Sequence, residues 1–322
     1  MRTATAIGVA LLVLMASAAC GADEQGHGVV PAATSPTTVA SSTSSGPTAA
    51  GGVIRTTLTF VDPARGTLAR PPVPAATERV LVTTVRRPSS GGGPWPLVVF
   101  GHGFDISSEA YAALLDGIAA AGFVVAAPEF PGSSTARPGR PDERDIAEEP
   151  CDLTVVATDL ESASAGTGEL AGTVRPGPIA LAGQSDGATA AAFAALAIGP
   201  CRPAVAPPVG AVVAFSANPV PADAVDRGLA APPAVLAITG SADSVNPPSH
   251  TRALFEQWPA AAWLLASADD GHLAPSTDST RRASIDSVVI DFLRGTLESD
   301  PAALERMSAD ASVPGLSLER RG

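Results

Sequence analysis

The pentapeptide Gly183-Gln184-Ser185-Asp186-Gly187 has the residue types and spacing of a serine nucleophile. The short apolar run 178–182 before it predicts a buried strand, and the alanine-rich segment after it predicts a buried helix. A serine at so tight a strand-to-helix corner needs neighbours without side chains, and the glycines Gly183 and Gly187 meet that need. The N-terminus of a helix that begins at Asp186 also favours a negative charge beside the serine.

A serine hydroxyl needs a general base at neutral pH, and histidine is the usual one. The chain has four histidines. His27 lies in a low-complexity N-terminal segment and His102 lies upstream of the serine, which leaves His250 and His272. His250 falls two residues into a predicted helix, whereas His272 lies in a loop directly after the last apolar run. We therefore predict that His272 is the base.

Asp243 is the predicted partner of this histidine, because it lies in the turn after the apolar run 234–238. An aspartate in such a turn more commonly stabilises the turn or caps a helix. Asp269 and Asp270 are closer to His272 in sequence, but neighbours in one loop rarely place a carboxylate beside an imidazole. Asp243 is therefore the predicted third member of a Ser-His-Asp triad.

Two backbone N–H groups are predicted to stabilise a negative oxygen at the reacting centre. Phe104 ends the segment 100–104, Phe-Gly-His-Gly-Phe, which follows a predicted strand. Its N–H and that of Asp186 are the predicted donors, and such donors are each worth about 10²–10³ in rate. His102 is predicted to hold this loop by hydrogen bonds and not to act as a base.

The order Ser185, Asp243, His272, the glycine-flanked serine and the His-Gly-Phe loop resemble the α/β-hydrolase superfamily. The resemblance is to its dienelactone hydrolase-like, platelet-activating-factor acetylhydrolase-like and polyester hydrolase-like branch of exported esterases, and it extends from Val53 to Leu297. It implies hydrolysis of a carboxylic ester of lipid, short-acyl or polyester type through an acyl-enzyme, without metal or organic cofactor. Many polyester hydrolases have His-Ser-Met at the turn, so Gln184 is a departure and a polyester substrate does not follow.

Two other functions remain open on the sequence. An acyltransferase of the cell envelope would use the same serine, and a surface-tethered ligand-binding domain would carry a silent triad. The net charge of −12 argues against nucleic acid as a partner, because phosphate binding needs clustered cations. The sequence does not determine the oligomeric state, and a monomer is the default expectation.

Apolar runs that alternate with helical patterns predict an α/β fold with a mostly parallel sheet of about eight strands and helices on both faces. The first two predicted strands, 53–60 and 79–85, are expected to form an antiparallel edge. The remaining strands are expected at 96–101, 122–127, 178–182, 211–215, 234–238 and 262–266. The loop 131–150 leaves the carboxyl end of a strand, on the edge where such sheets bind ligands, so it is expected to shape the mouth of the site.

Residues 1–20 have the three-part form of an export signal. Small residues before Cys20 favour lipidation of this cysteine and a membrane anchor at the cell surface, whereas cleavage after the Ala16-Ser17-Ala18 site would release the protein. Residues 21–52 are rich in serine, threonine, proline and alanine and predict a disordered tether. Residues 53–298 form the predicted catalytic domain, and 299–322 a tail with a short helix packed outside it.

The remaining cysteines, Cys151 and Cys201, are a candidate disulfide pair in an exported protein. Geometry disfavours the bond, because Cys151 is predicted to open one helix while Cys201 follows the end of the next. A helix of about 12 residues separates its ends by about 18 Å. The pairing therefore stays open on the sequence.

Overall fold

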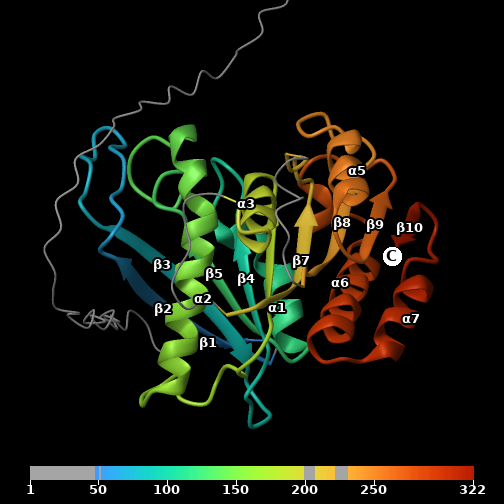
Figure 1. Ribbon diagram of the computed structural model, residues 1–322, viewed down its shortest axis with the longest axis horizontal. Coiled ribbons are helices and arrows are strands. Elements are labelled where there is room, and N and C mark those ends of the chain that lie inside the picture. The colour runs from blue at the N-terminus through green and yellow to red at the C-terminus, as the bar shows by residue number, and fades with distance from the viewer. Residues whose placement is uncertain (1–47, 51, 199–206, 222–230) are drawn as a thin grey trace, which may run out of the picture. The chain divides into compact units, whose positions relative to one another are not determined.

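The computed structural model describes residues 48–50, 52–198, 207–221 and 231–322 (Figure 1). The chain divides into two units, Met1–Pro36 and Thr37–Gly322, and every described residue belongs to the second. The predicted signal peptide, Cys20 and most of the predicted tether lie outside the described residues. Within these described ranges, no helix has both the length and the apolar character needed to cross a membrane.

One sheet contains ten strands of the described residues, in the order β1-β2-β3-β5-β4-β6-β7-β8-β9-β10. Neighbours from β5 to β9 pair in parallel, whereas β1, β2 and β3 at one edge and β10 at the other pair antiparallel. The strands are β1 (Thr48–Ala50), β2 (Val53–Asp62), β3 (Arg79–Pro88), β4 (Leu97–Gly101), β5 (Val124–Glu129), β6 (Ile179–Gln184), β7 (Val209–Phe215), β8 (Ala234–Gly240), β9 (Ala262–Ser267) and β10 (Leu316–Arg321). The mostly parallel sheet and its antiparallel β2–β3 edge confirm the predicted fold class.

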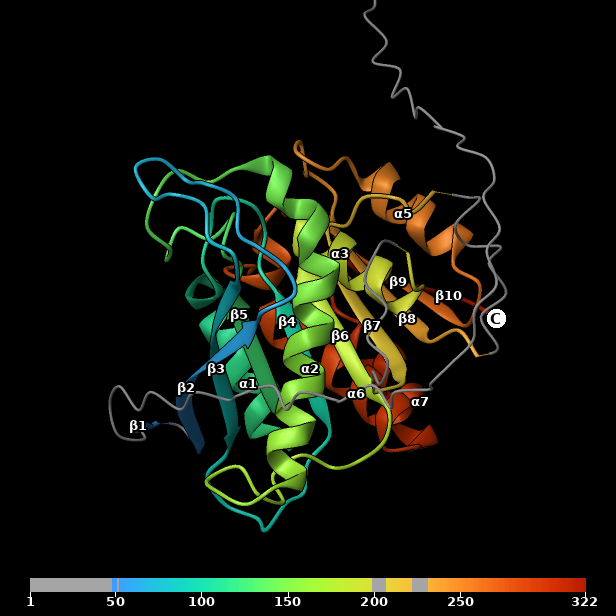
Figure 2. The same ribbon diagram turned by 60° about the vertical axis from the view of Figure 1, so that its left-hand side comes forward.

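Helices cover both faces of this sheet, and in Figure 2 α2 and α3 lie in front of it while α1 lies behind. The α-helices are α1 (Ala112–Ala120), α2 (Glu149–Ala165), α3 (Asp186–Ala195), α5 (Pro248–Gln257), α6 (Arg282–Leu297) and α7 (Pro301–Asp310). Short 3-10 helices are η1 (Ser108–Tyr111), η2 (Glu143–Glu148) and η3 (Ala274–Ser276).

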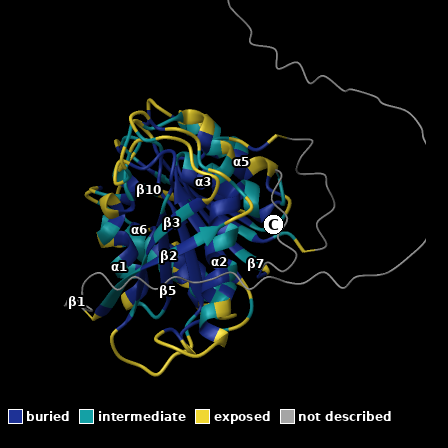
Figure 3. Cartoon of the chain, turned by 90° about the vertical axis from the view of Figure 1, so that its left-hand side faces the viewer, coloured by how far each residue is buried: buried dark blue, intermediate teal, exposed yellow. Residues whose placement is uncertain are grey.

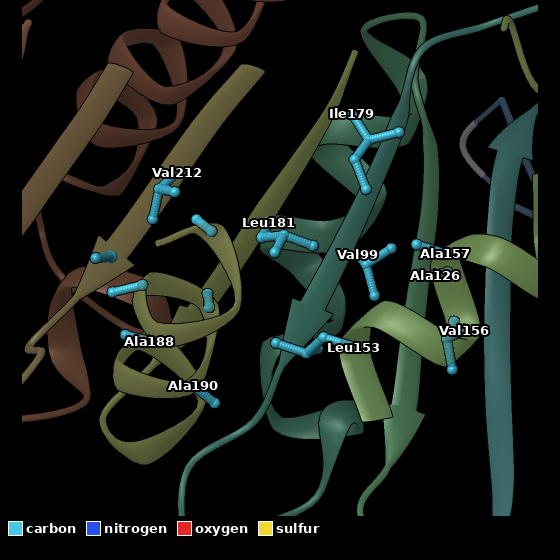
Figure 4. Close-up of a cluster of buried hydrophobic side chains, with 14 of the residues drawn as sticks. Val99, Ala126, Leu153, Val156, Ala157, Ile179, Leu181, Ala188, Ala190 and Val212 are labelled. Carbon is cyan, nitrogen blue, oxygen red and sulfur yellow. The ribbon is translucent and has the colours of Figure 1, made fainter. Parts of the chain in front are cut away.

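Each face of the sheet has its own hydrophobic core. Along β4, Leu97 and Val99 join the core under α2, α3 and α5, whereas Val98 and Phe100 join the core under α1, α6 and α7. Figure 4 shows the first core, where Val99 lies near Leu153 of α2. A strand that is buried on both faces is apolar throughout, and this explains the continuous apolar runs of the sequence. Figure 3 shows the consequence, a buried interior with exposure concentrated in the loops and outer helix surfaces.

Two strands were not predicted. Thr48–Ala50 form β1, antiparallel to β2, although the sequence analysis placed them in the disordered tether. In the tail, α7 fits the expected short helix, but Leu316–Arg321 then form β10 along β9. Both edge strands are held by backbone hydrogen bonds to a neighbour, and these bonds leave little trace in the pattern of side chains.

Candidate active site

Ser185 occupies the sharp corner between β6 and α3. Its backbone lies at φ 56° and ψ −119°, a region that non-glycine residues rarely adopt. A Cβ on Gly183 would lie 2.4 Å from the carbonyl of Gly187, and a Cβ on Gly187 would lie 2.3 Å from the carbonyl oxygen of Gly101. Close backbone contacts therefore require both glycines of the motif, and the corner carries the serine to the carboxyl edge of the sheet.

The side chains of Ser185, His272 and Asp243 form a hydrogen-bonded row. His272 Nε2 lies 2.9 Å from Ser185 Oγ, and His272 Nδ1 lies 2.8 Å from Asp243 Oδ2. Asp243 Oδ1 accepts hydrogen bonds from the backbone N–H groups of Val245 and Asn246, at 2.9 Å each, so that Oδ2 faces the imidazole. With its proton on Nδ1 beside the carboxylate, the imidazole leaves Nε2 to accept the proton of the hydroxyl.

The loop that carries His272 is anchored at the end of β7. Ser216 Oγ donates a hydrogen bond of 3.1 Å to the carbonyl oxygen of His272. The carbonyl oxygen of Ser216 in turn accepts a 2.7 Å hydrogen bond from Asn246 Nδ2, in the loop of Asp243. Ser216 thus links the loops of the imidazole and of the carboxylate. Ser216 was not predicted from the sequence, although its position directly after the apolar run 211–215 places it at the ligand-binding edge of the sheet.

The segment that carries Phe104 lies directly beside the serine. A Cβ on Gly103 would lie 3.3 Å from Ser185 Cβ, and one on Gly101 would lie 3.1 Å from Gly187 Cα. Among the described residues, the backbone N–H groups of Phe104 and Asp186 donate to no acceptor. Both predicted donors are therefore free of competing intramolecular hydrogen bonds.

His102 is a buried support for this segment. Its Nε2 accepts a 3.0 Å hydrogen bond from the N–H of Phe130, so Nδ1 carries the proton and donates to the carbonyl oxygen of Gly103 at 2.7 Å. Burial lowers the pKa of His102 and favours this neutral form. These contacts agree with the structural role that the sequence predicted for His102.

The rejected alternatives lie elsewhere. His250 Nδ1 contacts Asn218 Oδ1 at 3.1 Å, Asp269 is exposed, and His27 lies outside the described residues. Asp270 Oδ2 accepts hydrogen bonds from the hydroxyls of Ser267 and Ser279, at 2.5 and 2.6 Å. This aspartate therefore fixes the loop before His272 and does not contact the imidazole.

The loop between β5 and α2 borders the Phe104 segment. A cavity of about 490 Å³ is lined by Phe104, Asp105 and residues 140–144. Two buried arginines fix this loop. Arg70 donates hydrogen bonds to four of its carbonyl oxygens, including that of Pro131 at 2.8 Å, and Arg79 pairs with Asp145. The loop therefore forms a fixed, charged wall beside the candidate site, in the position expected from the sequence.

Burial raises the pKa of Asp186, which follows the serine, and of Glu149, which interacts electrostatically with Asp186. Burial raises the pKa of Asp186, while the neighbouring His272 opposes this shift. Burial raises the pKa of Glu149 well above its usual range, and its Oε1 accepts a 2.6 Å hydrogen bond from Ser133 Oγ. Glu149 Oε2 has no hydrogen-bond partner in the described structure. Both groups therefore retain their protons more readily than exposed carboxyl groups do.

Cys151 lies buried near the start of α2 and is disulfide-bonded. The other two cysteines of the chain, Cys20 and Cys201, lie outside the described residues. The partner of Cys151 is therefore a cysteine outside the described residues, and the pairing with Cys201 that the sequence disfavoured stays open.

Within the described residues, no group of three or more histidine, cysteine, aspartate or glutamate side chains is arranged to hold a metal ion. At the sheet edge a hydroxyl, an imidazole and a carboxylate form a hydrogen-bonded row beside two free N–H donors. This arrangement suits proton transfer and nucleophilic attack.

A comparison with protein families finds one described as Chlorophyllase, whose model matches residues 51–249. The match covers more than half of the chain and includes Ser185 and Asp243, while His272 lies beyond it. The family has the α/β-hydrolase fold and is esterase-like, which agrees with the resemblance found in the sequence. No curated protein matches the chain.

Proposed function

Because the chain belongs to the Chlorophyllase family of ester-hydrolysing α/β hydrolases, we propose that it is a serine hydrolase that cleaves a carboxylic ester through an acyl-enzyme. The observation that supports this most is the row from Ser185 Oγ through the imidazole of His272 to Asp243, with contacts of 2.9 and 2.8 Å. It begins at a residue held in a rare backbone conformation that exposes a nucleophile.

In the proposed first step, Ser185 Oγ attacks the ester carbonyl carbon while His272 Nε2 takes the hydroxyl proton. Asp243 accepts a hydrogen bond from Nδ1–H and stabilises the imidazolium that forms. The carbonyl oxygen becomes negatively charged and is bound by the N–H groups of Phe104 and Asp186. The start of α3 adds a positive dipole end at this point.

Collapse of the tetrahedral intermediate breaks the bond to the alcohol oxygen, and His272 gives its proton to the departing alcohol. Water then attacks the acyl-enzyme, with Nε2 as its base. The second collapse releases the acid and returns the proton to Ser185 Oγ. In both steps the imidazole of His272 takes up one proton and gives it back.

We expect Ser185→Ala to lower turnover of a short p-nitrophenyl ester by at least about 10³-fold, because the nucleophile is removed. The exposed Ser308 on α7 provides a control, and Ser308→Ala should retain full activity. A fluorophosphonate probe should label the wild type and Ser308→Ala but not Ser185→Ala. Full turnover by Ser185→Ala would refute the proposed mechanism.

The family name makes chlorophyll one substrate to test beside simple esters of increasing acyl length. Product analysis in the presence of an added alcohol separates hydrolysis from acyl transfer, because only transfer yields a new ester. Release of free acid as the main product supports hydrolysis, and accumulation of the new ester contradicts it.

A further inference from the structure

The residue before the nucleophile, Gln184, is buried at 1% exposure and ends strand β6. Its side-chain amide contacts two segments that are distant in sequence. Gln184 Nε2 donates a 3.1 Å hydrogen bond to the carbonyl oxygen of His272, and Gln184 Oε1 accepts a 2.8 Å hydrogen bond from the hydroxyl of Tyr111. One side chain thus donates a hydrogen bond to one segment and accepts one from the other.

The direction of these hydrogen bonds is fixed by chemistry. A carbonyl oxygen only accepts, so the amide nitrogen must face His272 and the amide oxygen must face Tyr111. The hydroxyl of Tyr111 therefore donates to Gln184, and its oxygen accepts a longer contact of 3.4 Å from the N–H of Gly103. A continuous path runs from the segment beside Phe104 through Tyr111 and Gln184 to the loop of His272.

The segment 101–104 is also packed on Gln184 directly. A Cβ on Gly103 would lie only 2.6 Å from Gln184 Oε1, so this segment approaches the amide as closely as a glycine permits. The order of strands shows why the other loop needs such an anchor. The loop of His272 follows β9 and must pass β8 and β7 to reach Ser185 at the end of β6. The carbonyl oxygen of His272 accepts hydrogen bonds from Gln184, at the end of β6, and from Ser216, directly after β7.

We propose that Gln184 is a positioning residue that couples the segment 101–104, the oxyanion-binding segment, to the loop of the catalytic His272 and holds both in place around Ser185. The inference rests on the proposed function. Gln184 and Tyr111 are both buried, so they act on the reaction only through the segments they hold. Their loss should therefore lower kcat and leave KM nearly unchanged.

The test uses the full-length protein and a neutral short-acyl p-nitrophenyl ester. Gln184→Met keeps the length of the side chain and removes both hydrogen bonds, and we expect a decrease in kcat of about 10–100-fold. Tyr111→Phe removes one oxygen atom, and we expect a decrease of about 3–10-fold. KM should change less than about two-fold in both variants.

Ser164→Ala is the matched control. Ser164 is buried near the end of α2, and its hydroxyl exchanges hydrogen bonds with the backbone of Val174, away from Ser185. We expect this variant to lower Tm, as a buried polar deletion should, with kcat unchanged. If Gln184→Met does not fold, Tyr111→Phe decides: a lower kcat at unchanged KM supports the proposal, and a wild-type kcat overturns it.

The double variant tests the coupling itself. Because Tyr111 acts largely through Gln184, Tyr111→Phe should cost little more than about two-fold when Gln184→Met is already present. Fully multiplicative losses would overturn the coupling, as would a wild-type kcat in Gln184→Met or a loss confined to KM. Retained turnover in Ser185→Ala is a separate result, because it would refute the proposed function and not the role of Gln184.

Discussion

Glycine at position 187 serves a steric need at the nucleophile corner. A Cβ there would lie 2.3 Å from the carbonyl oxygen of Gly101 and 2.4 Å from that of His102. Both obstacles are backbone atoms of the segment that leads to Phe104, so a larger residue would push this segment away from Ser185. The same glycine therefore allows the turn and sets the distance between the nucleophile and the oxyanion-binding segment.

We expect Gly187→Ala to lower the free energy of unfolding by about 1–3 kcal/mol and to reduce kcat, because overpacking displaces the Phe104 segment. Gly117 in α1 offers a matched control, since a Cβ there comes no closer than 3.9 Å to its nearest neighbour. Gly117→Ala should stabilise the protein by about 0.5–1 kcal/mol and leave kcat unchanged. Urea denaturation and steady-state kinetics measure both effects, and equal behaviour of the two variants would contradict this account.

Glu149 makes the stability of the protein depend on pH. Burial raises its pKa well above 4.5, so the folded state holds a proton that the unfolded state loses above about pH 4.5. When the folded state binds more protons, stability falls as pH rises. The contribution of Glu149 is thus fully present below about pH 4.5 and is lost as pH rises through the folded-state value.

Glu149→Gln should remove this contribution to the pH dependence, because glutamine resembles the protonated side chain and does not ionise. We expect the variant to gain stability relative to the wild type as pH increases from 4.5 to 8, in urea denaturation at several pH values. Burial also raises the pKa of Asp159 and Asp286 to about 6, but both are common to the two proteins and cancel in the difference. Glu305→Gln, on the exposed side of α7, is the control. The difference in free energy of unfolding between this variant and the wild type should stay constant with pH.

At the scale of elements, a buried arginine joins three segments. Arg79, at the start of β3, makes paired hydrogen bonds of 2.6–2.8 Å to Asp145 in η2 and to Asp152 in α2. Burial alone would lower the pKa of Arg79, but Asp152 and Asp145 raise it. Asp145 also accepts a 2.8 Å hydrogen bond from the N–H of Gly132. This cluster therefore holds both ends of the loop that borders the candidate site.

Arg79→Leu should lower the free energy of unfolding by about 3–5 kcal/mol, because it leaves the buried Asp145 without its cation. Asp152 loses one of its two arginine partners and keeps Arg65, at 2.8 Å. Arg252→Leu is the control, since Arg252 pairs with Glu319 on the surface and both side chains are more than 40% exposed. Its loss should cost at most about 1 kcal/mol. Similar costs in the two variants, measured by urea denaturation, would show that burial does not determine the contribution of the cluster.

For the whole molecule, the proposed esterase is expected to work outside the cell, held to the membrane by a lipid on Cys20. We expect an alkyne-labelled fatty acid to label the wild-type protein, and we expect the labelled protein in the membrane fraction. Cys20→Ala should lose the label, and Cys151→Ala, which leaves Cys20 in place, should keep it. An unlabelled wild type in the culture medium would instead favour cleavage after Ala18.

The sequence by itself determined the features that depend on neighbours along the chain. Continuous apolar runs predicted β4 to β9, because a strand buried on both faces must be apolar at every position. Alternating segments rich in β-branched residues predicted β2 and β3 at the edge. The glycine-flanked Ser185 predicted the corner between β6 and α3, because the turn itself requires those glycines. From these two features followed the fold class and the edge of the sheet at which to look for His272 and Asp243.

The tertiary structure decided the features that depend on contacts between distant segments. It joined β1 and β10 to the sheet through backbone hydrogen bonds, which residues of almost any type can form. It brought Ser185, His272 and Asp243 within hydrogen-bonding distance and showed that Asp270, the closer aspartate in sequence, binds two serines. The supports at Gln184 and Ser216 also appeared only here. A hydrogen bond between side chains depends on distances that folding sets, and spacing along the chain does not record them.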